Sequence, residues 1–571
     1  MTELGPTELE VVRHALAGVA EEMGVALRRA AYSPNIKERA DCSAAVFGPE
    51  GEMVAQAEHI PVHLGSMPAS VEAVLAAFGG RLAPSTQAVV NDPYAGGTHL
   101  PDLTIVSAVG DRSGHLLGYV ANRAHHADVG GAAPGSMPAT ATEIVMEGLR
   151  VPPTMLTDGA GLRRDVLELI AANSRTPQER MGDLRAQLAA NHVGTVRLGE
   201  LADRYGPDGL HRAMQAICDY SERRVRAAVR QIPDGRYRFA DHLEIGPGGR
   251  TQIAVEVTVE GDRIEIDFEG TDAQLPANLN AVYAITLSCC YFVLRMLTDP
   301  EAPPNAGCYR PLEVRAPRGS VVNALPPAPV AAGNVETSQR IVDALLGAFA
   351  QALPERVPAA GQGTMNNLLI GSGQGQAFSY YETLAGGEGA TPFRDGMSGV
   401  HTGMTNTRNT PAEAIELAYP LRIWRYELRE GSGGAGRYQG GEGLVREVEV
   451  LADQATLTIQ SERRTSAPWG LAGGEDGAPG RNVLIHPDGR EEELPSKGTW
   501  PVHEGDRVRV ETPGGGGWGT APSPSGDTAP SPEGKVGDTA PSPEGKVGDP
   551  LPPLRGRSGT PLPPLRGRAG E

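Results

Sequence analysis

The stretch that decides how this chain folds around its polar residues is NDPYAGGTHLPDLTIVSAVGDRSGHLLGYVANRAHHADVGG, residues 91–131. It contains two short apolar runs, at 103–109 and 115–121, joined by the turn-forming sequence DRSG. Two runs of this kind separated by a short polar turn are typical of a β-hairpin. The sequence therefore predicts a hairpin whose open end carries the polar residues that flank both runs.

The register of this hairpin decides which polar residues meet. If position 110 pairs with position 115, Asp102 faces Arg123, within one residue of register. His99 then faces His126. Opposed side chains in a hairpin lie about 5 Å apart. We therefore expect His99, Asp102 and either His125 or His126 to converge at the open mouth.

Two imidazoles and a carboxylate that converge are typical of a divalent metal site, and mixed nitrogen and oxygen ligands suit Zn, Mn or Fe. A further ligand is expected from Glu38 or Asp41 in the sequence IKERADCSAA. Asp128 is a candidate to orient a ligating histidine. The alternative is that these histidines only donate hydrogen bonds to loop carbonyls around a glycine-rich turn.

Two further histidines, His59 and His63, lie in the sequence EHIPVHLGS. They are candidates for the same cleft, and the alternative is a structural role in a loop. Asn91, Asp92 and Pro93 predict a turn, although Asp92 is also placed to face the site.

The rest of the chain predicts an α+β protein with several domains, mixed helices and antiparallel sheets. The expected helices cover 7–27 (with Thr7 and Glu10 as a capping box), 163–172, 176–232, 281–294 and 339–353. Alternating apolar residues predict a hairpin over 253–268 and strands from 421 onward. We expect an N-terminal region at 1–235 with the metal-site hairpin, a central α+β region at 236–415, and a β-rich C-terminal module at 416–519.

The last segment, 520–571, is compositionally different from the rest. GDTAPSPEGKV and PLPPLRGR each occur twice in it, with a period of 11 residues. Such repeats offer few residues for a core, so we expect a disordered tail. The chain has 74 glycines, and most of them lie in the body, where several flank the polar motifs. We expect these glycines to shape tight loops around the site.

Composition excludes several classes of function. Lys and Arg number 51 against 70 Asp and Glu, a formal charge of −19, which argues against nucleic-acid binding. Apolar runs are too short to cross a bilayer, and no secretory signal is expected, so the chain is predicted to be cytoplasmic. Five widely spaced cysteines suggest neither a disulfide framework nor a zinc ribbon. The glycine-rich runs lack the G-x-x-x-x-G-K-[ST] form of a phosphate-binding loop.

Several motifs, read in order along the chain, resemble the hydantoinase B/oxoprolinase family. They are IKERADCSAA (36–45), HIPVHLGSMP (59–68), NDPYAGGTHLPD (91–102), HHADVGG (125–131), PAPVAAGNVETSQR (327–340) and MTNTRNTPAE (404–413). The resemblance extends from about residue 5 to 519 and excludes the repeat-rich tail.

This resemblance implies a partner and a reaction. It implies the B-type subunit of an ATP-dependent cyclic amidase, a 5-oxoprolinase or N-methylhydantoinase type of hydrolase. An A-type ATPase subunit would phosphorylate the substrate carbonyl, and a metal-activated water would then open the lactam or hydantoin ring. The alternatives are the metal-containing subunit of an acetone or acetophenone carboxylase, or a non-catalytic scaffold.

The family's metal site, carried over motif by motif, falls on His99, Asp102, His125 and an acid in KERAD. Asp41 is favoured over Glu38 for that acid. Glu38, Asp128 and His63 are the candidate catalytic residues, with Glu38 or Asp128 as general base. His126 is left out of the predicted ligand set.

Overall fold

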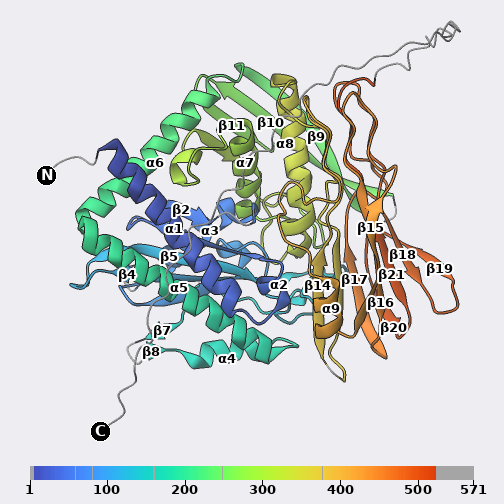
Figure 1. Cartoon of the computed structure of the whole chain (residues 1–571), viewed down its shortest axis with the longest axis horizontal. Helices are drawn as coiled ribbons and strands as arrows, with labels where there is room; N and C mark the ends of the chain where they lie inside the picture. Colours follow the sequence, from blue (N-terminus) through green and yellow to red (C-terminus); the bar gives the residue numbers. More distant parts are fainter. Residues whose placement is uncertain are drawn as a thin grey trace, which may run out of the picture. The chain divides into compact units, whose positions relative to one another are not determined.

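The predicted hairpin forms the centre of an antiparallel sheet with the strand order β2-β1-β5-β4-β3-β6 (Figure 1). The computed structural model describes residues 5–57, 60–79, 82–158, 161–246, 248–375 and 377–521. The strands of this sheet are β1 (Cys42–Phe47), β2 (Met53–Ala57), β3 (Gln87–Val90), β4 (Asp102–Gly110), β5 (Leu116–His125) and β6 (Thr154–Met155). A short ribbon, β7 (Thr157–Asp158) with β8 (Gly161–Leu162), follows β6.

The register of the hairpin differs from the predicted one. Asp102 pairs with His125, and Thr104 pairs with Arg123. Gly110 pairs with Leu116 instead of His115, and an irregularity between Val109 and Gly110 shifts the pairing by one further residue. The predicted pairs of Asp102 with Arg123 and of His99 with His126 are therefore wrong, while the predicted convergence at the open end is confirmed.

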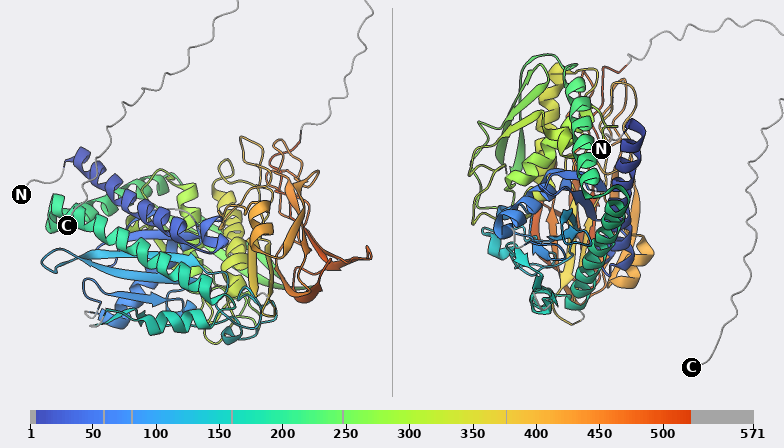
Figure 2. Two further views of the ribbon diagram at one scale, coloured as in Figure 1. Left: turned by 60° about the horizontal axis from the view of Figure 1, so that its bottom comes forward. Right: turned by 90° about the vertical axis from the view of Figure 1, so that its left-hand side faces the viewer.

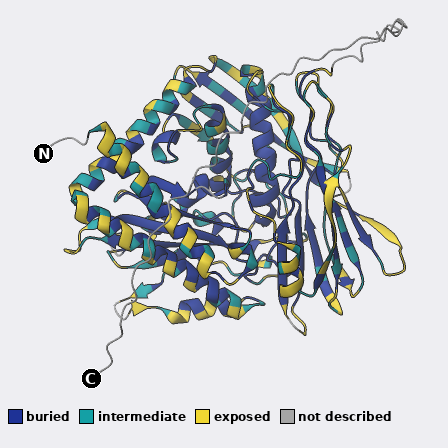
Figure 3. Ribbon diagram, in the orientation of Figure 1, coloured by how far each residue is buried: buried dark blue, intermediate teal, exposed yellow. Residues whose placement is uncertain are grey.

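Helices cover both faces of this sheet. On one face lie the long helices α1, α5 and α6 (Figures 1 and 2), and on the other lies α3. Strand β4 is accordingly buried almost throughout (Figure 3). The helices of this region are α1 (Pro6–Ala30), α2 (Pro34–Lys37), α3 (His63–Phe78), α4 (Arg164–Ala172), α5 (Pro177–Tyr205) and α6 (Pro207–Val229), with short 3-10 turns at Pro93–Ala95 and Ile144–Met146.

Two details of the predicted helices are wrong. Helix α1 begins at Pro6, and Glu8 accepts a hydrogen bond from the Gly5 backbone N–H, so Thr7 and Glu10 form no capping box. The long helical stretch is divided at Gly206, whose φ of 72° interrupts the α-helical backbone.

A second sheet, with the order β12-β11-β10-β9, packs against α8, which in turn packs against α7. The predicted hairpin at 253–268 is confirmed, with Val259 paired to Ile264. The elements here are β9 (Gly235–Ile245), β10 (Gly249–Glu260), β11 (Arg263–Asp267), α7 (Tyr283–Leu297), a 3-10 turn at Ala306–Tyr309, β12 (Leu312–Arg315), a π-helical turn at Gly333–Thr337 and α8 (Ser338–Ala352).

The C-terminal part is rich in strands, as predicted, and forms two sheets around an apolar core. Their orders are β14-β13-β17-β20 and β15-β16-β21-β18-β19. The elements are β13 (Asn367–Ser372), β14 (Phe378–Thr383), α9 (Ala412–Ala418), β15 (Leu421–Arg429), β16 (Gly443–Val450), β17 (Gln454–Gln460), β18 (Arg481–Ile485), β19 (Glu491–Leu494), β20 (Lys497–His503) and β21 (Arg507–Glu511). The α+β fold class with antiparallel-dominated sheets is thus confirmed.

The domain boundaries at 235 and 415 stay predictions. The chain divides into one unit, Met1–Pro522, and a second, Ser523–Glu571. The repeat-rich tail, predicted to be disordered, lies outside the described residues. Within the described ranges, no helix is long and apolar enough to cross a membrane.

The glycine-rich runs of the C-terminal part pack backbone against backbone. The N–H of Gly434 donates to the carbonyl of Gly515, and the N–H of Gly515 donates to that of Gly441. A Cβ atom at Gly515 would lie 1.9 Å from the carbonyl oxygen of Glu388. These glycines therefore form a tightly packed layer. Part of the high glycine content thus serves this packing and not, as we expected, the loops around the site.

We predict that Gly515→Ala lowers the free energy of unfolding by about 1–3 kcal/mol or more, because the added methyl group overpacks this layer. Gly373→Ala is the matched control, since a Cβ atom there has no neighbour within 4 Å. Chemical denaturation of both variants measures the difference. Equal stabilities would contradict the packing of this layer.

Candidate metal centre

The paired ends of the hairpin place a carboxylate between two imidazoles. Asp102 is the first residue of β4, and His125, the last residue of β5, lies opposite it. The Oδ1 atom of Asp102 lies 3.2 Å from Nδ1 of His125 and 3.3 Å from Nε2 of His99. The two ring nitrogens are 3.1 Å apart. One ligand atom from each residue thus falls within 4.8 Å of the others, a spacing that suits a single metal ion.

The loop that carries His99 is fixed by its own backbone and by one buried amide. The Nδ2 atom of Asn91 donates to the carbonyl of Leu100 at 2.7 Å. The N–H of Gly97 donates to the carbonyl of Asp92 at 2.9 Å. A Cβ atom at Gly97 would lie 2.6 Å from that oxygen, so the close approach requires glycine. Asp92 itself caps the following turn by accepting from the N–H of Tyr94.

The ring of His99 is oriented by a distant segment. Its Nδ1 atom lies 3.3 Å from the carbonyl oxygen of Ala331. A carbonyl can only accept, so the hydrogen of a neutral ring is on Nδ1 and the lone pair is on Nε2. That lone pair faces Asp102 and His125. Backbone carbonyls play this orienting role for many metal-binding histidines.

Asp41 and His63 lie at the same place. Both line a small cavity together with Asp102 and His125. The carbonyl of Asp41 accepts from the N–H of His125 at 3.1 Å, which fixes the residue beside the end of β5. The Nε2 atom of His63 is 3.7 Å from Oδ2 of Asp102, and its Nδ1 atom is 2.8 Å from the Ser43 hydroxyl.

All the titratable side chains of the site are buried. Burial acts to raise the pKa of Asp102, but the neighbouring imidazoles of His99, His125 and His63 hold it well below its usual range. Burial lowers the pKa of His63, which favours the neutral imidazole. A carboxylate that stays ionised is the ligand form that a metal ion requires.

Two of the predicted catalytic acids lie elsewhere. The carboxylate of Asp128 accepts hydrogen bonds from the N–H groups of Gly130, Gly135 and Arg175, and pairs with the Arg175 guanidinium at 2.9 Å. It holds this loop together. Glu38 is half-buried at the end of α2, and among the described residues the cavity is lined by Asp41 but not by Glu38. Catalytic roles for these two acids stay predictions that the geometry does not favour.

Two further histidines, His126 and His59, were candidates from the sequence. His126, which follows the last residue of β5, points away from the cluster. Its Nε2 atom is 2.9 Å from Oε1 of Gln187, and its Nδ1 atom is 2.8 Å from the Arg180 guanidinium. Burial and Arg180 lower its pKa to about 4. His59 lies outside the described residues.

Some residues of the site were not singled out from the sequence. Tyr381, from β14, stacks on His125 with ring centroids 4.8 Å apart, and Arg39 lies over the Tyr381 ring at 4.8 Å. Asn334, from the π-helical turn, places Nδ2 3.1 Å from Nε2 of His99. Asn334 lies within the quoted motif PAPVAAGNVETSQR, but nothing in the local sequence signals Tyr381.

The geometry fits a bound cation. The cavity measures about 20 Å³, which is room for one water molecule or ion. Around it, Oδ1 of Asp102 and Oδ1 of Asn334 are buried without a hydrogen-bond partner among the described residues. Unpartnered buried acceptors are unfavourable unless something electropositive binds them. A divalent ion held by His99, Asp102, His125 and Asp41 would meet that need.

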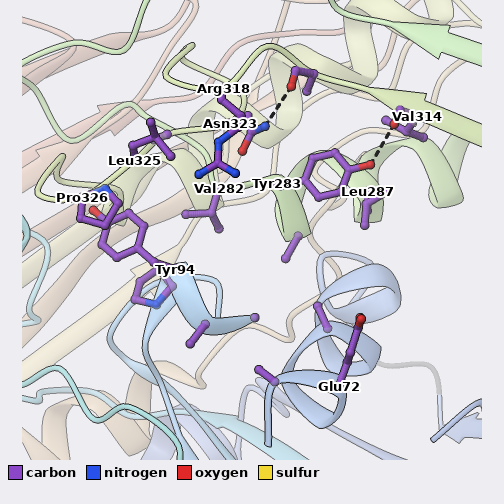
Figure 4. Close-up of a pocket in the computed structure, with 18 of the residues that line it drawn as sticks. Glu72, Tyr94, Val282, Tyr283, Leu287, Val314, Arg318, Asn323, Leu325 and Pro326 are labelled. Atoms are coloured by element: carbon purple, nitrogen blue, oxygen red, sulfur yellow. Dashed lines mark hydrogen bonds between the residues drawn. The ribbon is translucent and has the colours of Figure 1, made fainter. Parts of the chain in front are cut away.

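Larger cavities lie elsewhere among the described residues, and some of them share lining residues with the small one. A cavity of about 570 Å³ between α7 and α8 shares Thr405 with the small cavity. A groove of about 920 Å³, lined by Glu72 of α3 and Tyr283 of α7, is separate from it (Figure 4). Tyr94, in this groove, donates to the carbonyl of Ala328. A cavity of about 250 Å³ also adjoins the small one, through Ile60. The larger space for a substrate beside the small cavity is therefore on the side of Thr405.

Comparisons with known proteins identify the family of this chain. The model of the family Hydantoinase B/oxoprolinase matches residues 5–521. The 5-oxoprolinase 1 of Arabidopsis thaliana is 38% identical over 90% of this chain and 42% of its own length. A putative D-/L-hydantoinase component of the B type, from a Pseudomonas strain, is 32% identical over 91% of this chain and 90% of its own. This chain thus spans less than half of the plant protein.

A solved structure extends the comparison to the fold. The ATP-dependent caprolactamase from Pseudomonas jessenii superposes with a TM-score of 0.85 at 31% identity. The alignment covers 91% of this chain and 93% of that chain.

We predict that the purified chain carries about one divalent ion and that His99→Ala removes it, because the variant lacks one imidazole of the cluster. His115→Ala is the matched control, since His115 lies exposed near the turn of the same hairpin. Elemental analysis after gel filtration measures the ion content. Equal metal content in both variants would contradict a metal centre at His99.

Proposed function

This chain belongs to the hydantoinase B/oxoprolinase family, and from that premise we propose that it opens the ring of a small cyclic amide. The substrate class is a lactam or hydantoin, such as 5-oxoproline or N-methylhydantoin. The observation that carries the proposal is the cluster of His99, Asp102 and His125, of which Asp102 and His125 line an ion-sized cavity. The resemblance to a caprolactamase, an enzyme named for a cyclic amide, supports the substrate class.

Ring opening requires an activated amide. Nitrogen donates electron density into the carbonyl of an amide, so water attacks it slowly. Phosphorylation of the carbonyl oxygen turns it into an imidate-like species whose carbon is more electrophilic. In the net reaction, one water adds across the C–N bond, the nitrogen leaves with a proton, and a second water accounts for cleavage of ATP to ADP and phosphate.

We assign the phosphorylation to an A-type ATPase partner in a hetero-oligomer. The sequence contains no G-x-x-x-x-G-K-[ST] phosphate-binding loop. This chain aligns with 42% of the plant 5-oxoprolinase, so that protein has a further region of more than half its length. The Pseudomonas relative, which aligns over nearly its whole length, is named as one component of a hydantoinase. These facts support a division of labour between two polypeptides.

The side chains at the hairpin mouth would bind and orient the attacking water. A divalent ion such as Zn, Mn or Fe, held by His99, Asp102, His125 and Asp41, would supply Lewis acidity that lowers the pKa of a water from 15.7 towards about 7. All four residues are buried, which would limit the access of bulk water to the reacting carbon. The adjoining cavity of about 570 Å³ has room for a small cyclic amide beside Thr405.

His63 is the residue best placed to accept the proton of that water. Its ring lines the cavity, it is buried, and burial lowers its pKa, so it is available as a neutral base. Ser43, at 2.8 Å from Nδ1, orients the ring. Asp128, by contrast, has its carboxylate occupied by several N–H groups and by Arg175.

We predict that the chain, reconstituted with the A-type subunit of its own organism, opens 5-oxoproline or N-methylhydantoin only with ATP. His99→Ala should abolish ring opening while ATP hydrolysis by the partner is partly retained. Chromatography of the amino-acid or N-carbamoyl product, beside an ADP assay, measures both. Wild-type turnover in this variant would contradict the proposal.

The same assay separates the alternative functions. A carboxylated product that forms only with added bicarbonate would identify a carboxylase component. If the chain contains no stoichiometric metal, and if the complex keeps its activity when the residues of the cluster are substituted, the chain is a scaffold.

We further predict that His63→Gln lowers kcat by about 10²–10⁴-fold, the usual contribution of a general base, while the metal content stays at the wild-type level. Loss of the base should also flatten the acid side of the pH–rate profile. Ser43→Ala is an intermediate control, because it removes the hydrogen bond to Nδ1 of His63 and leaves the imidazole in place. An unchanged pH–rate profile in His63→Gln would exclude His63 as the proton acceptor.

A further inference from the structure

The buried amide of Asn334 faces the metal centre from a different part of the chain. It lines the small cavity together with Asp41, Asp102 and His125. Asn334 is 4% exposed, and its Oδ1 atom has no hydrogen-bond partner among the described residues. A buried amide oxygen in this condition requires a partner that the protein itself does not supply.

The backbone around Asn334 is shaped to hold it there. Asn334 lies in a π-helical turn, Gly333–Thr337, immediately before α8, and such turns are frequent at functional sites. A Cβ atom at Gly333 would lie 1.9 Å from the carbonyl oxygen of Asn280, so only glycine fits. The N–H groups of Ala332 and Gly333 both donate to the carbonyl of Asn278. The turn is thus clamped against a neighbouring loop.

Several polar atoms in and beside the cavity are acceptors. Asp102 contributes a carboxylate oxygen without a partner among the described residues, and Asn334 contributes an amide oxygen in the same condition. His99 presents the lone pair of Nε2, because its Nδ1–H is directed to the Ala331 carbonyl. A neutral ligand such as water has donors for two of these acceptors, whereas a cation satisfies all of them at once.

The side chain of Asn334 and a cation would compete for the same nitrogen. In this structure Nδ2 of Asn334 lies 3.1 Å from Nε2 of His99 and donates to it. A cation on that lone pair displaces the N–H donor. Rotation of the amide by 180° exchanges its oxygen and nitrogen with little change in shape, and the two orientations are assigned from hydrogen bonds alone. The rotated amide directs Oδ1 towards the cation and places Nδ2 where Oδ1 has no partner in the unrotated orientation.

We propose that Asn334 is a further ligand of the metal ion, through Oδ1, and that it joins the π-helical turn to the hairpin when the ion binds. The proposal rests on the proposed function for the presence of the ion. It adds an amide oxygen to the two imidazoles and the carboxylates. Such a mixed set favours Mn or Fe, which accept six ligands, over the four-coordinate preference of structural Zn.

The test compares metal binding by two variants of the full chain. Asn334→Leu keeps the approximate size of the side chain and removes the oxygen, and Asn334→Asp restores an oxygen ligand. We expect Asn334→Leu to weaken Mn²⁺ binding at least about tenfold, and Asn334→Asp to bind at least as tightly as wild type. Titration of the metal-free chain with Mn²⁺, followed by electron paramagnetic resonance, measures free and bound ion without any assay of activity.

A matched control separates ligation from packing. Gln339, a buried amide on the first turn of α8, donates to the carbonyl of Thr402 and accepts from the N–H of Met404. Gln339→Leu should leave the Mn²⁺ affinity unchanged. Thermal unfolding of all three metal-free variants reports whether each one folds.

The outcomes are distinguishable. Equal affinity of Asn334→Leu and wild type would overturn the proposal and leave the proposed function intact. Equal weakening in Asn334→Leu and Asn334→Asp would also overturn it, because an oxygen at this position would then not help. A wild-type chain that binds no Mn²⁺, Fe²⁺ or Zn²⁺ would overturn the metal centre itself.

Discussion

The pairing of Asp102 with His125 across one hairpin is the constraint on which the rest of the site depends. The two residues stand opposite each other because Gly110 pairs with Leu116 at the turn and an irregularity between Val109 and Gly110 shifts the pairing by one further residue. A shift by one residue would turn each side chain to the other face of the sheet. His99, three residues before Asp102, then needs only a tight loop to reach the same carboxylate oxygen.

Other segments close the centre from outside the hairpin. Asp41 comes from the entry to β1, Asn334 from the turn before α8, and Tyr381 from β14. A buried ionic network ties α8 to the C-terminal sheets, since Asp343 pairs with Arg340 at 3.0 Å and with Arg463 at 2.6 Å. The cluster of His99, Asp102 and His125 therefore lies where several segments of the described body meet, which explains why its side chains are so deeply buried.

Much of this could be predicted from the sequence, for identifiable reasons. The hairpin, the helices and the convergence of His99, Asp102 and His125 depend on spacing over about thirty residues, where periodicity and turns are informative. The exact register was missed, because neither the pairing of Gly110 with Leu116 at the turn nor the irregularity beside it leaves a mark in the sequence. Asn334 and Tyr381 reach the site over long separations, which a local pattern does not encode. The glycine runs were visible, but their packing against one another was not.

The central claim is that His99, Asp102 and His125 bind one divalent ion. X-ray absorption spectroscopy of the purified chain at the edge of its bound metal tests this most directly. The account predicts nitrogen and oxygen ligands only, at about 2.0–2.2 Å, with the multiple-scattering pattern of two imidazoles. A spectrum with sulfur ligands, or one without imidazole scattering, would contradict it.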